Sequence, residues 1–152
     1  MRQRSLFTAL AACAFLLAAG GAWAQATPSG LWKTIDDGTK KEKSLVRIVE
    51  SGGVYTGRVE KILDTTSPPD AVCKDCTDER KDKPVLGMTI LRNVRQDADD
   101  KGLFGGGDIL DPNNGKVYSV RLKPIDNGAR LEVRGYIGTP LLGRSQTWIR
   151  AE

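Results

Sequence analysis

The 152-residue chain contains no histidine. Histidine is the commonest general base, the commonest metal ligand and the usual partner of a nucleophilic serine or cysteine, so its absence excludes catalysis by a Ser–His or Cys–His pair. The chain also lacks the nucleophile-elbow, P-loop and dinucleotide-binding patterns, and its glycine run at residues 105–107 does not lie between an expected strand and an expected helix. We therefore expect no catalytic residues, no cofactor and no enzymatic activity.

The chain has no apolar run long enough to span a membrane. Its longest apolar stretch, residues 6–19, is shorter than the roughly 20 residues that a transmembrane helix requires. The stretch follows Arg2 and Arg4 and precedes Ala22-Trp23-Ala24, a small-x-small tripeptide that suits signal peptidase. We expect residues 1–24 to be a signal peptide cleaved after Ala24, and the protein to be periplasmic or secreted without a stable membrane span.

An alternative targeting signal overlaps this segment. The tetrapeptide Leu10-Ala11-Ala12-Cys13 resembles the lipobox of bacterial lipoproteins, in which the cysteine carries the lipid. The apolar run continues past Cys13, which would leave a hydrophobic N-terminus after cleavage. We therefore favour the cleaved signal peptide, with a lipidated Cys13 as the alternative.

The remaining residues, 25–152, form one expected domain of nearly balanced charge. Two of the 23 basic residues and none of the 19 acidic ones precede residue 25, so the domain has 21 basic residues against 19 acidic ones, a net charge of +2. Basic and acidic residues are interleaved, as in residues 40–43 and 78–83, which is typical of solvated loops rather than of a stripe that follows phosphates. We expect no nucleic-acid partner.

The domain also lacks helical periodicity, and its apolar residues alternate with polar ones in short runs bounded by turn residues. Ser51-Gly52-Gly53 and Asn127-Gly128 are strong hairpin signals. The pattern predicts strands over residues 30–35, 44–50, 54–63, 104–110, 115–125, 129–137 and 145–150, with a further apolar run at 88–94. We predict an all-β fold, an antiparallel up-and-down barrel of about eight strands, because closure removes exposed edges; a two-sheet sandwich is the alternative.

Alternation assigns one face of each strand to the interior. Tyr118 and Val120 share a face, and Leu131, Val133 and Ile137 share another. An eight-stranded barrel is either filled by such side chains or holds one small ligand, so plain packing is the alternative for each of them. We predict that a small apolar ligand contacts a set of interior residues: Trp32, Met88, Tyr118, Val120, Leu131, Val133 and Trp148.

Cysteine is scarce, because only Cys73 and Cys76 lie beyond residue 24. Tetrahedral zinc requires four ligands, which two cysteines without histidine do not supply, so we expect no metal site. A thioredoxin-type pair lies at a helix N-terminus in a βαβ unit, which this context lacks. Export favours a structural disulfide, with thiol–disulfide exchange as the alternative. The pair lies in residues 64–84, a loop long enough to indicate a functional role.

Several motifs resemble those of a known family. Gly30-Leu31-Trp32 resembles the G-x-W of lipocalin-like barrels, in which an arginine of the last strand covers the tryptophan; here Arg150 is expected to close the barrel over Trp32. The more specific motifs are Gly57-Arg58-Val59, Lys83-Pro84 with Gly87-Met88, Asp111-Pro112 with Gly115-Lys116-Val117-Tyr118, Leu131 to Tyr136, Gly138 to Pro140, and Gly143 to Arg150.

Together these motifs resemble a bacterial family of small exported domains of unknown function with a lipocalin-like β-barrel. The resemblance covers residues 30–150 and implies the fold and export. It supplies no catalytic residues. By analogy of fold it implies a small hydrophobic ligand. We predict an exported ligand-binding barrel; the alternative is a structural or protein-interaction module of the cell envelope. The sequence leaves the oligomeric state open.

Overall fold

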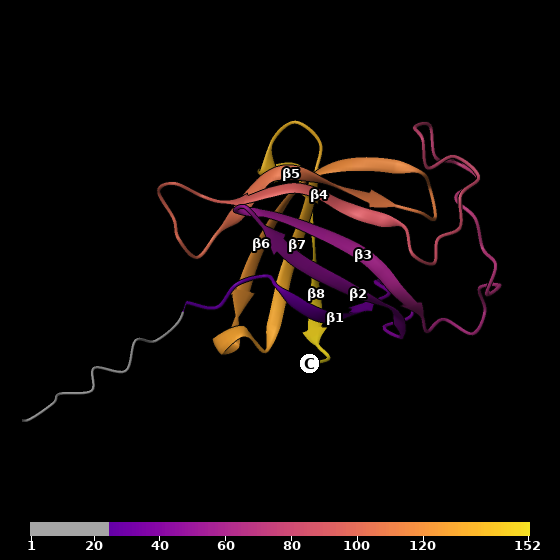
Figure 1. Cartoon of the computed structure of the whole chain (residues 1–152), viewed down its shortest axis with the longest axis horizontal. Helices are drawn as coiled ribbons and strands as arrows, with labels where there is room; N and C mark the ends of the chain where they lie inside the picture. The colour runs from indigo at the N-terminus through magenta and orange to yellow at the C-terminus, as the bar shows by residue number, and fades with distance from the viewer. Residues whose placement is uncertain (1–24) are drawn as a thin grey trace, which may run out of the picture.

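The structure is a computed structural model that describes residues 25–152, so the expected signal peptide and Cys13 lie outside the described residues. Eight antiparallel strands form one closed barrel in the order of the sequence (Figure 1). The strands are β1 (Gly30–Ile35), β2 (Glu42–Ser51), β3 (Val54–Ile62), β4 (Thr89–Gln96), β5 (Phe104–Asp111), β6 (Lys116–Ile125), β7 (Arg130–Tyr136) and β8 (Arg144–Arg150). The predicted up-and-down barrel is confirmed, and the sandwich is excluded.

The strand boundaries follow the turn residues of the sequence. The apolar run at residues 88–94, whose state the sequence left open, is part of β4. The Asn-Gly pair forms the short 3-10 turn η1 (Asp126–Gly128), in which Asn127 and Gly128 have φ values of 55° and 84°. Asparagine and glycine tolerate this left-handed region better than other residues, so the turn forms where the sequence predicts it.

Successive connections alternate between the two ends of the barrel, because each strand reverses the direction of the previous one. The β2–β3, β4–β5 and β6–β7 connections lie at one end, which we call the closed end. The other end, the mouth, carries residues 36–41, 63–88, 112–115 and 137–143. The last of these contains the 3-10 turn η2 (Pro140–Leu142). Figure 1 shows residues 63–88 as a long excursion beyond the ends of β3 and β4.

The closed end is sealed by a tryptophan under an arginine. Trp32 is fully buried, and its Nε1 donates a hydrogen bond to the Pro28 carbonyl at 2.7 Å. The guanidinium carbon of Arg150 lies 4.2 Å from the centroid of the Trp32 ring, in a cation–π geometry. Arg150 also donates to the Ser29 and Gly128 carbonyls. These contacts tie the last strand to the segment that precedes the first.

Large apolar side chains fill the half of the barrel next to this seal. Tyr55 and Phe104 meet edge to face, with ring centroids 5.1 Å apart. Other fully buried members of the packed half are Val46, Ile48, Leu91, Val94, Val120, Leu122 and Leu131. Within residues 25–152, no helix combines the length and the apolar character needed to cross a membrane.

Candidate functional site

A cavity of about 690 Å³ opens from the packed half toward the mouth. Its inner wall is apolar and is formed by Val59, Ile90, Val133 and Trp148. All four mouth connections contribute to its outer wall, together with the inward-facing ends of the strands. A cavity of this volume is within the range that small-molecule sites occupy in proteins.

The inward face of β8 changes from apolar to charged as it approaches the mouth. Register pairs Trp148 with Leu131, Gln146 with Val133, and Arg144 with Gly135, so these three residues of β8 share the inward face. Trp148 Nε1 donates to Gln146 Oε1 at 3.2 Å, and Gln146 Nε2 donates to Asp37 Oδ2 at 2.8 Å. The amide therefore links the indole at the inner wall to a carboxylate of the rim.

A second polar pair lies on the neighbouring strands. Thr34 Oγ1 and Ser44 Oγ are 2.8 Å apart across the β1–β2 ladder, and both residues line the cavity. At the rim, Asp64 accepts hydrogen bonds from Thr66 and Ser67, and these bonds, that of Thr66 first, hold the pKa of its carboxyl below its ordinary value. The cavity thus has an apolar inner wall and a rim that contains fixed carboxylates.

The predicted interior residues divide between the cavity and the buried core outside it. Tyr118, Val133 and Trp148 line the cavity. The other four residues, Trp32, Met88, Val120 and Leu131, are buried in the core and do not line it. The prediction treated the interior as one chamber, whereas large side chains fill the half next to the seal. Contact of any of the seven with a ligand stays a prediction.

Alternation placed Ile137 on the dry, inward face of its strand with Leu131 and Val133. Ile137 does line the cavity, but β7 ends at Tyr136 and the side chain is 68% exposed at the mouth, so it is not dry. The period-two pattern continued past the point where the ladder stops. Gly138, with φ 78°, turns the chain away at that point.

Sequence reasoning missed the polar lining of the cavity. Thr34, Ser44, Gln146 and Arg144 all line it. Period-two spacing carried the signal for three of them, since Thr34 lies two residues from Trp32, and Gln146 and Arg144 lie two and four residues from Trp148. The predicted interior set contained only apolar and aromatic residues, so these polar positions were left out of it.

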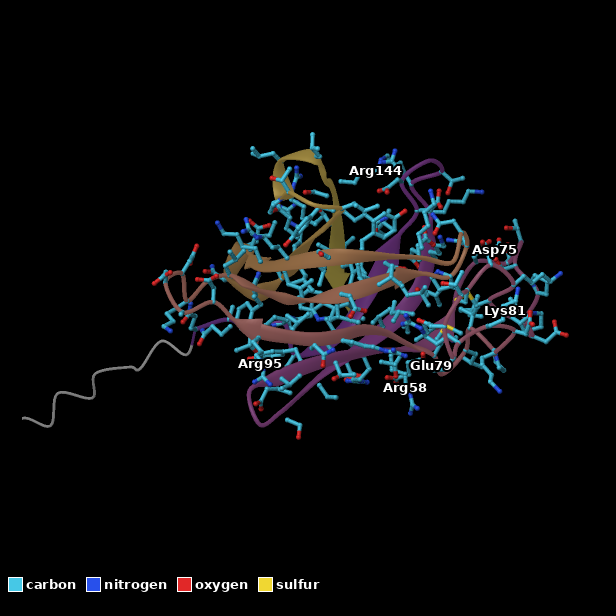
Figure 2. The ribbon with its side chains drawn as sticks, turned by 90° about the horizontal axis from the view of Figure 1, so that it is seen from above. Arg58, Asp75, Glu79, Lys81, Arg95 and Arg144 are labelled. Carbon is cyan, nitrogen blue, oxygen red and sulfur yellow. A yellow bond between two sulfur atoms is a disulfide. The ribbon has the colours of Figure 1, made fainter. Side chains whose placement is uncertain are left out.

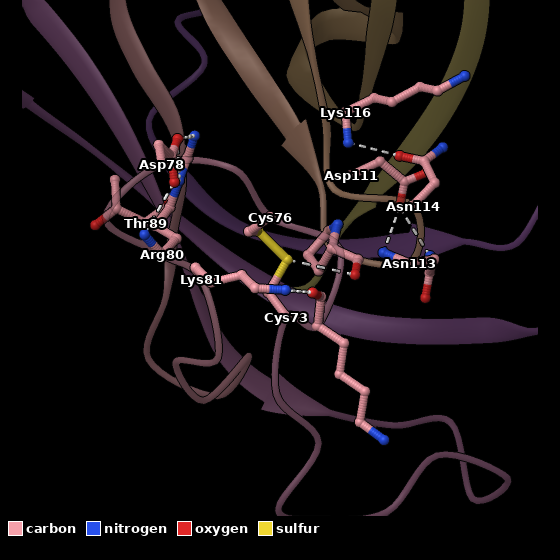
Figure 3. Close-up of a disulfide and its surroundings, with 12 residues drawn as sticks. Cys73, Cys76, Asp78, Arg80, Lys81, Thr89, Asp111, Asn113, Asn114 and Lys116 are labelled. Atoms are coloured by element: carbon pink, nitrogen blue, oxygen red, sulfur yellow. Dashed lines mark hydrogen bonds and ion pairs between the residues drawn. A yellow bond between two sulfur atoms is a disulfide. The ribbon is translucent and has the colours of Figure 1, made fainter.

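The disulfide predicted between Cys73 and Cys76 is confirmed, and it pins the loop of residues 64–84, which we call the flap, to a neighbouring turn. Both cysteines are buried, although the flap is otherwise mostly exposed. Cys73 Sγ lies 3.6 Å from the Pro112 carbonyl oxygen in the β5–β6 connection (Figure 3). The disulfide therefore anchors the flap on the neighbouring β5–β6 turn.

The β5–β6 turn accommodates the flap because of one glycine. Gly115 has a φ of 70°, and a Cβ built on it would overlap the Asp75 carbonyl and lie 2.6 Å from the Cys76 nitrogen. Only a residue without a side chain allows this approach of two backbones. Gly115 thus determines where the flap packs against the β5–β6 turn.

A buried ion pair provides the second anchor. Arg80 is 5% exposed, and it binds both carboxylate oxygens of Asp78 while its Nη1 donates to the Thr89 carbonyl of β4 at 3.0 Å (Figure 3). The hydrogen bonds from Arg80 lower the pKa of the Asp78 carboxyl to about 2. The flap is therefore held on β4 as well as on the β5–β6 turn.

The flap also pairs with itself. Val72 and Pro84 form an antiparallel bridge, and Cys73 N donates to the Lys83 carbonyl at 2.9 Å while Asp82 N donates to the Cys73 carbonyl at 2.9 Å. Figure 2 shows Asp75 and Lys81 on this segment, beyond the ends of the strands. Flap residues that include Ala71, Val72, Lys74 and Asp75 line the cavity. The flap thus forms part of the outer wall of the cavity.

An up-and-down barrel of eight strands, with a tryptophan sealed by an arginine at one end and a cavity at the other, is a lipocalin-like barrel. A solved structure of a Helicobacter pylori protein described as belonging to the lipocalin family matches it with a TM-score of 0.70 and 22% identity, covering 84% of each chain. At that identity the likeness establishes the fold. The family model described as "Uncharacterized protein conserved in bacteria (DUF2147)" matches residues 30–150, and the chain belongs to that family. No curated protein matches the chain.

The contact at Gly115 yields a stability prediction. Gly115→Ala should lower the free energy of unfolding by about 3 kcal/mol or more, because backbone strain and overlap with the flap add. Gly52→Ala is the matched control: its φ is also positive, at 58°, but nothing lies within 4 Å of its Cβ position. The control should be destabilised only by backbone strain, which costs about 1–2 kcal/mol. Equal decreases in the free energy of unfolding of the two variants, measured by urea denaturation, would show that the flap does not pack on Gly115.

The Asp78–Arg80 pair yields a pH prediction. The pKa of Asp78 is about 2 in the folded protein, below its ordinary value of 3.8, so its stabilising effect is complete above about pH 4 and is lost as the pH falls toward 2. Asp78→Asn should lower the free energy of unfolding at neutral pH by about 1–3 kcal/mol, because the buried guanidinium of Arg80 loses its charged partner. It should also flatten the dependence of stability on pH below about 4.

Glu79→Gln is the control for that experiment. Glu79 lies beside Asp78 on the flap and binds the guanidinium of Arg92, but its side chain is 66% exposed. Exposed ion pairs contribute little, so we expect a change below about 1 kcal/mol. Denaturation at neutral and acid pH measures both variants, and an equal response of the two would mean that Asp78 is not an anchor of the flap.

Proposed function

We propose that this protein is an exported, non-enzymatic barrel, periplasmic or secreted, that binds a small amphipathic molecule in the cavity beneath the flap. The observation that carries the proposal is the cavity of about 690 Å³ with its apolar inner wall and polar rim. The lipocalin-like fold supports it as an analogy, since the interior of an eight-stranded barrel that side chains do not fill is wide enough for one small ligand.

The wall chemistry specifies the class of ligand. Val59, Ile90 and Val133 supply apolar surface near the packed half, while Arg144 and Gln146 supply donors at the rim. Sites of this kind bury an apolar body and orient it by a few polar groups. The ligand we propose therefore has an apolar portion directed toward Trp148 and a polar portion at the mouth.

Burial of the cysteines favours this function over thiol exchange. Exchange begins with attack of a thiolate on a disulfide sulfur, and its rate depends on access to that sulfur. Cys73 and Cys76 are 0% and 2% exposed. A structural role for the bond agrees with its place at the contact between flap and turn.

A variant that fills the cavity tests the proposal. Gly135 faces the cavity with a negative φ, and a Cβ there makes ordinary contacts with Tyr118 and Ile109, so Gly135→Leu should fold. It should weaken binding of anilinonaphthalene sulfonate by about tenfold or more, because its side chain occupies the ligand volume. Ser119→Leu is the control, since Ser119 is exposed on the outer face of β6.

Tryptophan fluorescence locates the probe in that experiment. Trp148 lines the cavity, whereas Trp32 lies under the seal. Quenching or a shift of emission on binding should persist in Trp32→Phe and disappear in Trp148→Phe. No binding by the wild-type protein, together with native mass spectra that show no retained molecule, would refute the proposed function.

Export is tested by the mass of the mature protein. We expect the protein recovered from the periplasm or medium of its bacterial host to begin at Gln25, because Ala22-Trp23-Ala24 suits signal peptidase. Intact-mass spectrometry measures this directly. A full-length protein confined to the cytoplasm would contradict export, and a diacylglyceryl mass on Cys13 would establish the lipoprotein instead.

A further inference from the structure

The connection between β7 and β8 exposes three large aliphatic side chains at the mouth. Ile137, Leu141 and Leu142 are 68%, 87% and 80% exposed. Leu141 and Leu142 lie in η2, and we call residues 137–143 the leucine turn. Single exposed aliphatic residues are ordinary, but three within six positions form a patch at the tip of one turn.

The structure holds this turn in a fixed conformation. Thr139 Oγ1 accepts a hydrogen bond from the Leu141 nitrogen, and Pro140 occupies the first turn of η2. Arg134 Nε donates to the Pro140 carbonyl at 2.7 Å, and its Nη1 donates to Ser145 Oγ at 2.9 Å. Gly143 packs so closely that a Cβ there would lie 2.7 Å from the Gly135 carbonyl oxygen. The leucines are therefore presented by a braced turn.

The leucine turn lies across the mouth from the flap. In a closed barrel of eight strands, the β7–β8 connection is four strands away from the β3–β4 connection, which contains the flap. Ile137 and Leu142 also line the cavity, whereas Leu141 does not. The apolar patch is thus continuous with the cavity and separate from the polar flap.

Basic residues flank the patch on its own two strands. Arg144 follows the turn, and Arg134 braces it and faces Arg121 across the β6–β7 ladder. The rim also contains the carboxylate of Asp37, on the neighbouring β1–β2 connection, which accepts a hydrogen bond from Gln146. The arginines beside the leucine turn therefore favour contact with an anionic surface.

We propose that the leucine turn docks the mouth of the barrel onto an anionic lipid bilayer, with Leu141 and Leu142 inserted among the lipids and Arg144 against the headgroups. A stable protein partner requires about 800 Å² of surface on each side, far more than a tip of three aliphatic side chains presents. A bilayer accepts such a convex tip, because side chains penetrate the boundary between headgroups and acyl chains. Basic residues beside them add attraction to anionic lipids.

Co-sedimentation of the purified mature protein with lipid vesicles tests the proposal. We expect binding to vesicles of phosphatidylglycerol and phosphatidylcholine, and weaker binding to phosphatidylcholine alone or at high salt. Leu141→Ser with Leu142→Ser should reduce binding by about tenfold or more, since each inserted leucine contributes apolar transfer free energy. Val49→Ser is the matched control, because Val49 is 52% exposed at the end of β2 nearer the closed end.

A gain-of-signal variant makes the test independent of lost stability and of ligand binding. Leu141→Trp should bind the anionic vesicles and shift its emission to the blue, because position 141 enters the apolar layer. Leu141 does not line the cavity, so anilinonaphthalene sulfonate should bind Leu141→Ser as it binds the wild type. Docking is refuted if the wild type does not bind anionic vesicles, or if the double serine variant binds them as tightly as the wild type. It is also refuted if Leu141→Ser dissociates a dimer, which would place the turn between two copies of the protein.

Discussion

Closure of the barrel depends on a short seam between its first and last strands. Only Trp32 with Arg150 and Lys33 with Ile149 are paired across that seam, whereas β2 and β3 share eight residue pairs. Arg150 compensates through its stacking on Trp32 and its hydrogen bonds to the Ser29 and Gly128 carbonyls, which bring the N-terminal segment and η1 to the same guanidinium. The side-chain contacts of Arg150 thus reinforce the shortest ladder of the barrel.

The same seam explains why the cavity lies at the mouth. Beyond Lys33 the two strands are no longer paired, and the hydrogen bond from Gln146 to Asp37 spans the gap. Side-chain volume also places the cavity at the mouth. The half next to the seal contains the large side chains of Trp32 and Phe104, while the small residues Thr34, Ser44 and Gly135 face the other half. Small polar residues at the inward positions leave space that large apolar ones fill elsewhere.

The sequence predicted the fold well and the site only in part, for reasons that individual residues show. Strand positions and hairpins follow local signals such as Asn127-Gly128, so the barrel could be derived. The division of its interior could not, since Val120 and Val133 have the same alternation, and Val133 lines the cavity although it pairs with Leu122, nearer the closed end than Val120. The contact of Gly115 with the flap joins positions about forty residues apart and left no local signal beyond a glycine.

The mouth therefore combines two preordered segments of opposite character. The flap is anchored on β4 and on the β5–β6 turn by Arg80 and the disulfide, and its buried groups are satisfied within the protein. The leucine turn is braced by Arg134, yet its apolar groups contact solvent. The two segments lie four strands apart, so the apolar side chains of the turn and the polar flap occupy opposite sides of the mouth. Ile137 and Leu142 also line the cavity, so the apolar patch borders its opening on the side away from the flap.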